Sequence, residues 1–420
     1  MSPDRLRIRR GVAGALTLLF VTVTVAAASP VSQLSSSGGP IWDMAALRRP
    51  PAVRQAEGFA EPGLRAVYYE GLPWKGNTTR AFAWIGLPPN AAQYPAPGIV
   101  LVHGGGGTAF AEWVRLWVDR GYAAIAMDTC GCTPRGSYGN WQRHEHGGPP
   151  GWGGFDQVDE PTGDQWTFQA IANVVLAHSL LASLPEVDAN RIGITGISWG
   201  GYLTCIAAGV DDRFKFAVPV YGCGFLGENS TWLGTFERMG DKKSTKWLQL
   251  WDPSVYLSQA RMPMLWVTGT NDFAYPMDSL QKSYRLPKGP RTLSVRVRMA
   301  HAHGGPGENP EEIRALADSI TGRATALPAF GNQGVTEAAA WAHFKSAQTI
   351  DRAELNYTTD SGPWKERRWQ SVSARIDLAA ERVEADLPAG TAVYYFNLIS
   401  KDGLVVSSEH VTLPPQRTSP

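Results

Sequence analysis

The stretch that decides the fold is Gly196-Ile197-Ser198-Trp199-Gly200. A short apolar run, residues 191–195, precedes it, and an apolar helical segment, residues 201–208, follows it. A strand that turns sharply into a helix with a serine at the corner is typical of a nucleophile elbow, where the serine is strained and its hydroxyl points outward. The flanking glycines leave room for such a turn. We therefore predict that Ser198 is a catalytic nucleophile, with an ordinary turn serine as the alternative.

Apolar runs recur on both sides of this stretch and alternate with helical segments. The runs lie at residues 98–102, 122–127, 192–195, 216–220, 264–268 and 293–297, and the helical segments include residues 111–120, 168–184 and 309–320. This alternation predicts an α/β fold with a doubly wound, mostly parallel sheet that helices cover on both faces. Two further strands, at residues 64–69 and 80–85, are expected to form an antiparallel edge of the sheet.

The pattern changes after residue 322 to short strands separated by turns. Candidate strands lie at residues 354–357, 373–376, 383–387 and 394–398, and Asp402-Gly403 is a hairpin signal. We predict a small immunoglobulin-like β-sandwich over residues 330–415. The catalytic domain is expected to span residues 63–325.

The N-terminus has the pattern of an export signal. Four arginines within residues 5–10 precede an apolar segment, residues 11–25, and an alanine-rich cleavage site. This predicts a signal peptide over residues 1–28, and the Ser, Gly, Pro and Ala content of residues 29–62 suggests a flexible lead-in. We expect a secreted or periplasmic protein that leaves the membrane after cleavage; an uncleaved membrane anchor is the alternative.

The composition excludes several classes of function. The 39 basic and 38 acidic residues nearly balance and form no basic stripe, so nucleic acid is not an expected partner. The 4 cysteines are too few for a disulfide scaffold and lack the paired spacing of a zinc site. Export permits a disulfide between Cys223 and Cys130 or Cys132, whereas Cys205 is expected to be a buried apolar residue. No cofactor or metal is expected.

Two later segments supply the partners that a serine nucleophile needs. In folds of this kind the chain order is Ser, Asp or Glu, then His. Asp272 follows the strand at residues 264–268, at the sheet edge where ligands bind. His301 and His303 follow the next strand. We favour His303 as the general base because a few loop residues let its ring reach back to Ser198, and His301 is the alternative. A metal site on the two histidines lacks a third ligand.

A glycine-rich run, residues 103–107, follows another predicted strand. Consecutive glycines let peptide N–H groups approach a substrate carbonyl, so we predict an oxyanion hole made of the backbone amides of Gly105, Gly106 and Trp199. A phosphate-binding loop would need the Lys and Ser/Thr of a P-loop, which are absent. His103 is expected to brace the loop. The whole set predicts a serine hydrolase that forms an acyl-enzyme.

These segments resemble the α/β-hydrolase superfamily, and within it the dienelactone hydrolase, acetylxylan esterase and prolyl-oligopeptidase-like group. The resemblance covers about residues 60–322 and rests on residues 103–107, the run Asp188-Ala189-Asn190-Arg191 leading into residues 192–201, Asp272 and His303. Dienelactone hydrolases use a cysteine nucleophile where this chain has Ser198, so the acetylxylan-esterase-like branch fits better. That resemblance implies deacetylation of acylated carbohydrates, with a small-molecule or polysaccharide ester as substrate.

The substrate pocket is expected to draw on a segment rich in Gly, Pro and Trp, residues 130–165, as a lid or wall; an ordered surface loop is the alternative. Trp141, Trp152, Trp232 and Trp251 are the candidate substrate contacts, because exposed indoles stack on sugars. The rival enzyme is a prolyl-oligopeptidase-like serine peptidase, although the region ahead of the catalytic domain is too short for the propeller those enzymes usually carry. A noncatalytic carbohydrate-binding protein is a third hypothesis, and an intact triad argues against it.

Overall fold

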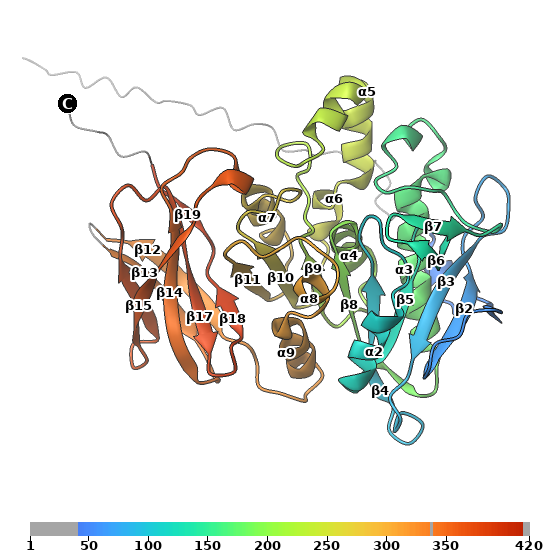
Figure 1. The fold of residues 1–420 in the computed structure, drawn as a ribbon, viewed down its shortest axis with the longest axis horizontal. Coiled ribbons are helices and arrows are strands. Elements are labelled where there is room, and N and C mark those ends of the chain that lie inside the picture. Colours follow the sequence, from blue (N-terminus) through green and yellow to red (C-terminus); the bar gives the residue numbers. More distant parts are fainter. Residues whose placement is uncertain (1–40, 337–338, 415–420) are drawn as a thin grey trace, which may run out of the picture. The chain divides into compact units, whose positions relative to one another are not determined.

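The computed structural model describes residues 41–336 and 339–414. Within these ranges, nine strands form one sheet in the order β1-β2-β3-β5-β4-β8-β9-β10-β11 (Figure 1). They are β1 (Val53–Gln55), β2 (Leu64–Glu70), β3 (Arg80–Gly86), β4 (Ala96–Val102), β5 (Ala123–Met127), β8 (Val187–Ile197), β9 (Ala217–Val220), β10 (Met264–Gly269) and β11 (Arg291–Arg296). The strands from β5 to β11 are parallel, and β1, β2 and β3 form an antiparallel edge. The predicted sheet is confirmed.

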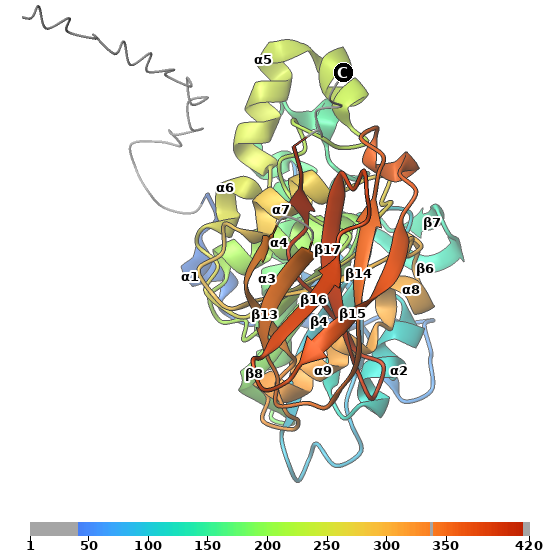
Figure 2. The same cartoon turned by 90° about the vertical axis from the view of Figure 1, so that its left-hand side faces the viewer.

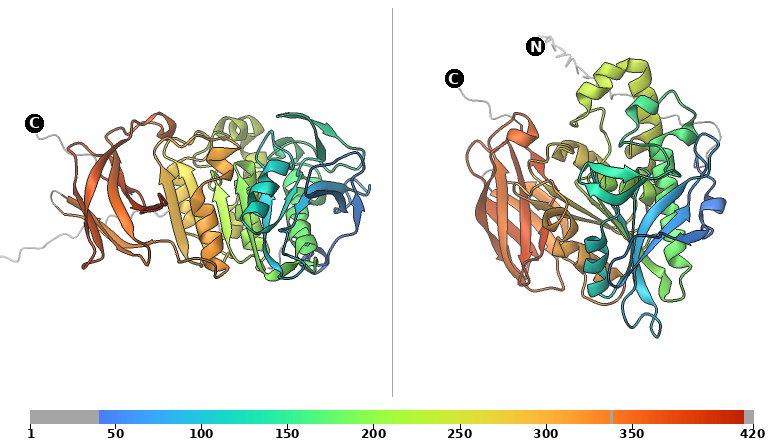
Figure 3. Two further views of the ribbon diagram at one scale, coloured as in Figure 1. Left: turned by 60° about the horizontal axis from the view of Figure 1, so that its bottom comes forward. Right: turned by 45° about the vertical axis from the view of Figure 1, so that its right-hand side comes forward.

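Helices pack along both faces of this sheet (Figure 3). They are α1 (Met44–Leu47), α2 (Ala111–Asp119), α3 (Trp166–Ala182), α4 (Trp199–Val210), α5 (Leu233–Trp251), α6 (Ser254–Leu257), α7 (Met277–Tyr284), α8 (Gly305–Glu308) and α9 (Glu311–Ile320). The central strands β4, β5 and β10 are buried along their whole length. A strand covered on both faces buries every side chain, which is why these segments are continuous apolar runs in the sequence.

The lead-in predicted over residues 29–62 is wrong for the part from residue 41 onward. Trp42 is buried, its ring stacks on Phe168 at 5.5 Å, and its Nε1–H donates to the Phe168 carbonyl at 2.9 Å. β1 extends the main sheet at its antiparallel edge. One large apolar side chain therefore anchors a segment whose composition suggests a flexible linker. The predicted signal peptide and the rest of the lead-in lie outside the described residues.

Helix α5 is a second element that the sequence pattern does not predict. Gly240 interrupts it with a positive φ of 73°, so that two helical segments meet at a kink (Figure 1). Phe236, Trp247 and Trp251 are its buried side chains, whereas its lysines are exposed.

In the described ranges, no helix is sufficiently long and apolar to cross a membrane.

Within the described part of the chain, the C-terminal strands form a second, antiparallel sheet of eight strands that folds around its own apolar core, and this domain faces the viewer in Figure 2. The strands are β12 (Ala329–Val335), β13 (Ala339–Lys345), β14 (Ile350–Thr358), β15 (Gln370–Asp377), β16 (Arg382–Asp386), β17 (Val393–Ser400), β18 (Val405–Ser407) and β19 (Val411–Thr412). Leu355, Tyr394 and Phe396 are fully buried in that core. The predicted β-sandwich is confirmed, and we call it the β domain.

The β domain packs directly on the last strand and helix of the catalytic domain. Glu312 of α9 is buried and accepts a hydrogen bond from the Val405 amide at 2.6 Å. The Val295 amide of β11 donates to Ser407 Oγ at 2.8 Å. Tyr395 joins the buried apolar cluster of the catalytic domain. Side chains of the β domain therefore form hydrogen bonds with backbone groups at the free edge of β11. Without the β domain, these groups would have no partner in the protein.

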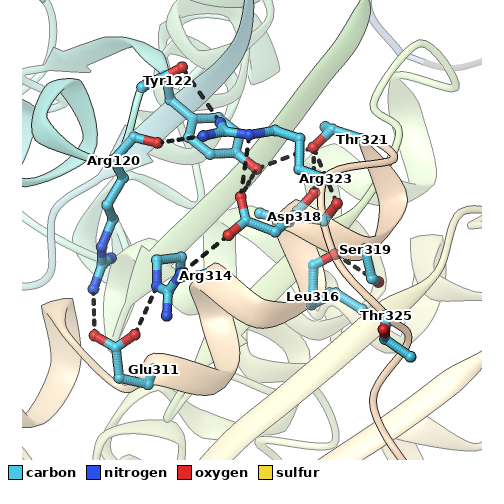
Figure 4. A network of polar contacts seen from close by, with 12 residues as sticks. Arg120, Tyr122, Glu311, Arg314, Leu316, Asp318, Ser319, Thr321, Arg323 and Thr325 are labelled. Carbon is cyan, nitrogen blue, oxygen red and sulfur yellow. Dashed lines mark hydrogen bonds and ion pairs between the residues drawn. The ribbon is translucent and has the colours of Figure 1, made fainter. Parts of the chain in front are cut away.

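A polar network fixes α9, which follows the His301 loop, against the rest of the catalytic domain (Figure 4). The Tyr122 hydroxyl donates to Asp318 Oδ1 at 2.9 Å, and Arg120 pairs with Glu311 at 3.0 Å. Arg323 lies 4.9 Å from the Tyr122 ring centroid and donates to the Arg120 carbonyl at 2.9 Å. Burial, and then the neighbouring Asp318, raises the pKa of Tyr122, so its hydroxyl keeps the proton that it donates.

His410 gives the interface between the two domains a dependence on pH. Its ring is buried, with its centroid 5.2 Å from that of Trp364. Burial, and then the nearby Arg285, lowers the pKa of His410 from 6.5 to about 4. Because the unfolded chain takes up this proton at higher pH than the folded chain, the neutral ring stabilises the fold above pH 6.5, and this stability is lost as the pH falls towards 4.

We expect His410→Gln to remove part of the acid sensitivity of the fold. Because the unfolded chain binds this proton at higher pH, His410 should lower the free energy of unfolding by about 3 kcal/mol between pH 7 and pH 4. Urea unfolding between pH 7 and pH 4 measures this loss, and His343→Gln, at an exposed position of the same domain, is the control. Equal pH dependence in the two variants would contradict the assignment.

Candidate active site

Ser198 lies at the turn between β8 and α4 with φ 57° and ψ −117°, a strained conformation for a residue with a side chain. Glycines make the turn possible. A Cβ on Gly200 would lie 1.9 Å from the Val102 carbonyl oxygen, and one on Gly196 would lie 2.2 Å from the Gly200 carbonyl oxygen. The predicted strand–serine–helix turn is confirmed, and backbone atoms of neighbouring segments leave no room for other residues at these two positions.

Asp272 follows β10 and is buried at the carboxyl edge of the sheet. Its Oδ1 accepts hydrogen bonds from the amides of Ala274 at 2.9 Å and Tyr275 at 2.8 Å. Its Oδ2 lies 2.7 Å from Nδ1 of His301. Because an ionised carboxylate only accepts, Nδ1 of His301 carries the proton, and Nε2 is left as a proton acceptor.

The ring of His301 is held by aromatic neighbours. Tyr221 stacks on it with centroids 4.5 Å apart and planes 23° apart, and the Tyr221 hydroxyl donates to the Ala300 carbonyl at 2.7 Å. The Phe273 ring also lies near, at 4.8 Å. These contacts fix the orientation of the imidazole, as a general base requires.

The prediction that His303 is the partner of Asp272 is wrong. Its Nε2 accepts the Gly104 amide hydrogen at 3.0 Å, and its Nδ1 lies 3.1 Å from Glu308 Oε1. The acceptor nitrogen of His303 is therefore occupied by a peptide N–H. The physical reason is the length of the loop: β11 ends at Arg296, and four loop residues already bring His301 to the carboxylate.

His103 braces the glycine-rich loop, as predicted. It is buried, its Nδ1 lies 2.8 Å from the Gly104 carbonyl oxygen, and its Nε2 accepts from the Thr129 amide at 3.0 Å. Burial lowers the pKa of His103, and the neutral ring then has one donor and one acceptor to match these two partners.

The hairpin of β6 (Cys132–Ser137) and β7 (Asn140–Arg143) holds the other carbonyl groups of the loop. The Tyr138 hydroxyl donates to Gly105 O at 2.6 Å, and Nε1–H of Trp141 donates to Gly106 O at 2.8 Å. Within residues 41–336 and 339–414, the amides of Gly105 and Trp199 make no backbone hydrogen bond. Both amides are thus available to a substrate oxygen, as an oxyanion hole requires.

These elements meet at a pocket of about 380 Å³. Its lining consists of Gly105, Tyr138, Ile197, Ser198, Trp199, Thr231, Trp232, Phe273, Ala274, His301, Ala302 and His303. The structure therefore brings together the predicted nucleophile, both candidate bases and two of the three predicted oxyanion residues. Gly106 does not line the pocket, since its carbonyl is held by Trp141 and the Tyr138 ring lies against it.

Trp232 is the one predicted tryptophan contact that lines this pocket. The prediction for Trp251 is wrong, because that side chain is buried and its Nε1–H donates to Gln165 Oε1 at 2.7 Å. Trp141 holds the glycine-rich loop, and Trp152 packs half-buried beside the core; neither lines the pocket. A tryptophan in an apolar helix is more often a core residue than a ligand contact.

Two aromatic residues that the sequence reasoning missed stand at the pocket instead. Tyr138 and Phe273 line it and are 59% and 54% exposed. Tyr138 lies in the segment predicted to form a pocket wall, and Phe273 directly follows the predicted acid. The signal in the sequence that could have identified these two pocket residues was their position next to the predicted site segments. Residue type, here tryptophan, was a poorer guide.

The four cysteines, all of which lie in the described residues, are free thiols. The disulfide to Cys223 that export would permit is therefore not formed in this structure, whereas the predicted burial of Cys205 is confirmed. Burial raises the pKa of Cys130, Cys205 and Cys223. These thiols remain protonated and act as apolar packing groups.

Comparisons with known proteins agree with this geometry. A family model described as prolyl oligopeptidase family matches residues 162–319, and one described as acetyl xylan esterase (AXE1) matches residues 64–237. The acetyl xylan esterase from Paenibacillus sp. R4 has a similar fold, with a TM-score of 0.51 and 22% identity over 66% of this chain and 92% of that chain. The chain belongs to the α/β-hydrolase superfamily.

The two matched families are of the acetylxylan esterase and prolyl-oligopeptidase-like group, and both matches support an enzyme of the serine hydrolase type. Acetyl xylan esterase 1 from Thermoanaerobacterium sp. JW/SL YS485 shares the fold with a TM-score of 0.50 and 17% identity over 64% of this chain and 88% of that one. The Uncharacterized peptidase YuxL of Bacillus subtilis (strain 168) is 27% identical over 240 residues, which are 52% of this chain and 33% of that protein. The chain thus spans a third of that relative's length.

We expect the two histidines to differ sharply when replaced. If His301 is the base, His301→Ala removes it, and kcat on a short p-nitrophenyl ester should fall at least about 10³-fold. His303→Ala only loosens the loop that bears the Gly105 amide and should cost about 10- to 100-fold. His303→Gln keeps an acceptor for the Gly104 amide and should recover part of that loss. A larger loss for His303→Ala than for His301→Ala would give the base role to His303.

Proposed function

We propose that this protein is a carboxylic ester hydrolase that deacetylates acylated carbohydrates through Ser198, His301 and Asp272. The observation that carries the proposal is the contact of 2.7 Å between Asp272 Oδ2 and His301 Nδ1, together with a pocket that both His301 and Ser198 line. The match to the acetyl xylan esterase family model, which includes Ser198, supports the choice of substrate class.

In the first half-reaction, Ser198 Oγ attacks the acetyl carbonyl carbon while its proton passes to His301 Nε2. The carbonyl oxygen becomes negative and is stabilised by the amides of Gly105 and Trp199. Asp272 stabilises the imidazolium form of His301 across their hydrogen bond. The intermediate then expels the sugar oxygen, which takes the proton from His301, and the acetyl group stays on Ser198.

In the second half-reaction, water replaces the sugar hydroxyl. His301 Nε2 accepts a proton from this water as its oxygen attacks the acetyl carbon on Ser198. The same two amides stabilise the second oxyanion. Collapse returns the proton from His301 to Ser198 Oγ and releases acetate. Each residue is thus restored, so no cofactor is consumed.

The character of the pocket supports a neutral ester with a ring-shaped alcohol. Its lining contains two histidines but no Asp, Glu, Lys or Arg side chain, so it offers no ion-pair partner of these types to the free amino or carboxyl group of a peptide. Tyr138 and Phe273 expose apolar ring surface at the pocket, where large exposed apolar side chains are typical of a ligand site. Such rings match the apolar faces of sugars.

The second candidate is a serine peptidase, and one observation favours it. The prolyl oligopeptidase family model, over residues 162–319, includes Ser198, Asp272 and both histidines, whereas the acetyl xylan esterase model ends before Asp272. The two activities use the same nucleophile and base, and they differ in whether the leaving group is an alcohol or an amine.

We also propose that the protein acts outside the cytoplasm, where polysaccharides are accessible. The support is the signal-like sequence of residues 1–28. N-terminal sequencing of the protein recovered from the medium or periplasm of its native host should find Ser29 as the first residue, and an intact Met1 would contradict export by cleavage.

We expect wild-type protein to release acetate from acetylated xylan faster than it cleaves prolyl dipeptide amides. Ser198→Ala should lower ester hydrolysis by at least about 10⁴-fold with an unchanged melting temperature, because the nucleophile is lost and a smaller side chain fits the turn. Initial rates on matched esters and amides measure both effects. Faster amide cleavage would favour the peptidase, and unchanged turnover in Ser198→Ala would exclude this serine as the nucleophile.

We expect Phe273 to discriminate between alcohols. Since Phe273→Ala removes exposed ring surface at the pocket, kcat/KM for an acetylated xylo-oligosaccharide should fall about 3- to 10-fold more than kcat/KM for ethyl acetate. The ratio separates this effect from any disturbance of His301, which acts on both substrates. Leu378→Ala, at an exposed position of the β domain, is the control. An unchanged ratio in Phe273→Ala would contradict a sugar-binding role.

A further inference from the structure

The β domain contacts the loop that carries Asp272. Nδ2 of Asn271 donates to the carbonyl oxygens of Arg367 at 2.7 Å, Lys365 at 3.1 Å and Trp364 at 3.3 Å. These acceptors belong to or follow the short turn η3 (Trp364–Glu366) of the β domain. An amide nitrogen has two hydrogens, so the three carbonyls share them. The side chain next to the proposed acid is thus held by backbone of the other domain.

The same side chain connects the Asp272 loop with the His301 loop. Oδ1 of Asn271 accepts from Thr270 Oγ1 at 2.7 Å, and Thr270 Oγ1 accepts from the Arg298 amide at 3.0 Å. Arg298 has a positive φ of 55°, an unfavourable conformation that its surroundings must hold in place. A continuous row of hydrogen bonds therefore runs from the β domain, through the acid loop, to a point three residues before His301.

The η3 turn is itself a firm support. Trp364 is buried and belongs to the apolar cluster of the catalytic domain. The Arg367 guanidinium lies 3.7 Å from the Trp364 ring centroid, and its Nε–H donates to the Gly362 carbonyl at 2.8 Å. Stacking and backbone hydrogen bonding together fix the carbonyl groups that Asn271 contacts.

We propose that the β domain is part of the catalytic machinery, and that Asn271 is the positioning residue through which it keeps Asp272 and His301 in register. This inference rests on the proposed function of Ser198, His301 and Asp272. Its physical basis is that a base and its carboxylate partner on two separate loops need a common support. Loss of the Asn271 side chain removes the hydrogen bonds from this loop to the β domain, since no other part of residues 270–272 bonds to the β domain among the described residues.

The test compares Asn271→Ala with Gln281→Ala in the full chain. Gln281 Nε2 donates to the His410 carbonyl at 2.8 Å, so its replacement also removes a hydrogen bond between the two domains, but away from the Asp272 loop. We expect both variants to lower the free energy of unfolding by similar small amounts. Asn271→Ala alone should lower kcat on a short ester about 10- to 100-fold with KM within about 2-fold, since only the alignment of the reacting groups is impaired. Asn271→Gln keeps the amide and should recover part of kcat.

Two readouts separate positioning from a merely structural role. Because the Asp272 contact orients the proposed base, a loosened contact should change the pH profile of kcat/KM in Asn271→Ala relative to wild type and Gln281→Ala. Thr270→Val, an isosteric change that breaks the link to Arg298, should shift it the same way. Equal kcat and equal pH profiles in Asn271→Ala and Gln281→Ala would overturn the inference.

A spectroscopic measurement makes failure of this inference distinguishable from failure of the proposed function. The hydrogen-bonded Nδ1 proton of His301 gives a low-field proton resonance whatever the substrate is. We expect it to be present in wild type, Ser198→Ala and Gln281→Ala, and to be lost or shifted in Asn271→Ala. An unshifted resonance in Asn271→Ala overturns the positioning role. This outcome does not depend on whether Ser198→Ala supports or excludes the proposed hydrolysis.

Discussion

The close approach of backbone at Gly200 is the constraint on which the site depends. The Gly200 Cα lies so near the Val102 carbonyl that a single added carbon would be 1.9 Å from that oxygen. This contact places the first turn of α4 against the end of β4, which puts the Trp199 amide opposite the glycine-rich loop that β4 leads into. The strained φ of 57° at Ser198 is the cost of that approach, and the buried strands on either side hold it in place. The predicted oxyanion hole therefore depends on glycine at position 200.

Two histidines that each contact a carboxylate line one pocket, and they differ in the partner of the second ring nitrogen. His301 and His303 each place Nδ1 beside a carboxylate, Asp272 at 2.7 Å and Glu308 at 3.1 Å. In His303 the other nitrogen accepts the Gly104 amide, so it orders the oxyanion loop. In the proposed mechanism, the other nitrogen of His301 exchanges a proton with Ser198. Residue type alone is therefore an insufficient guide to role, because identical side chains two positions apart meet different backbone.

Elements with a local sequence pattern were predicted correctly. The prediction failed where a contact between residues far apart in the sequence determines the burial or the role of a side chain. The parallel sheet, the elbow and the position of Asp272 follow from apolar runs and from what comes directly after them. The choice between His301 and His303 does not, because it depends on how many loop residues are needed to cross from β11 to the carboxylate. The burial of Trp42 and Trp251 is likewise set by partners, Phe168 and Gln165, that are more than eighty residues away in sequence. From composition alone, the segment that contains Trp42 was predicted to be a flexible linker, and Trp251 was predicted to be a substrate contact.

A boundary between domains in sequence is not a boundary in function here. The strand pattern changes after residue 322, yet the buried Glu312 on one side bonds to the Val405 amide on the other, and Trp364 fills the core of the catalytic domain. An independent carbohydrate-binding module would need a surface of its own and no shared core. This domain instead satisfies the edge of β11 and supplies the carbonyl groups beside Asp272. Its removal would expose an unpaired strand edge and apolar surface, so the fold that makes the hydrolase site includes both parts of the chain.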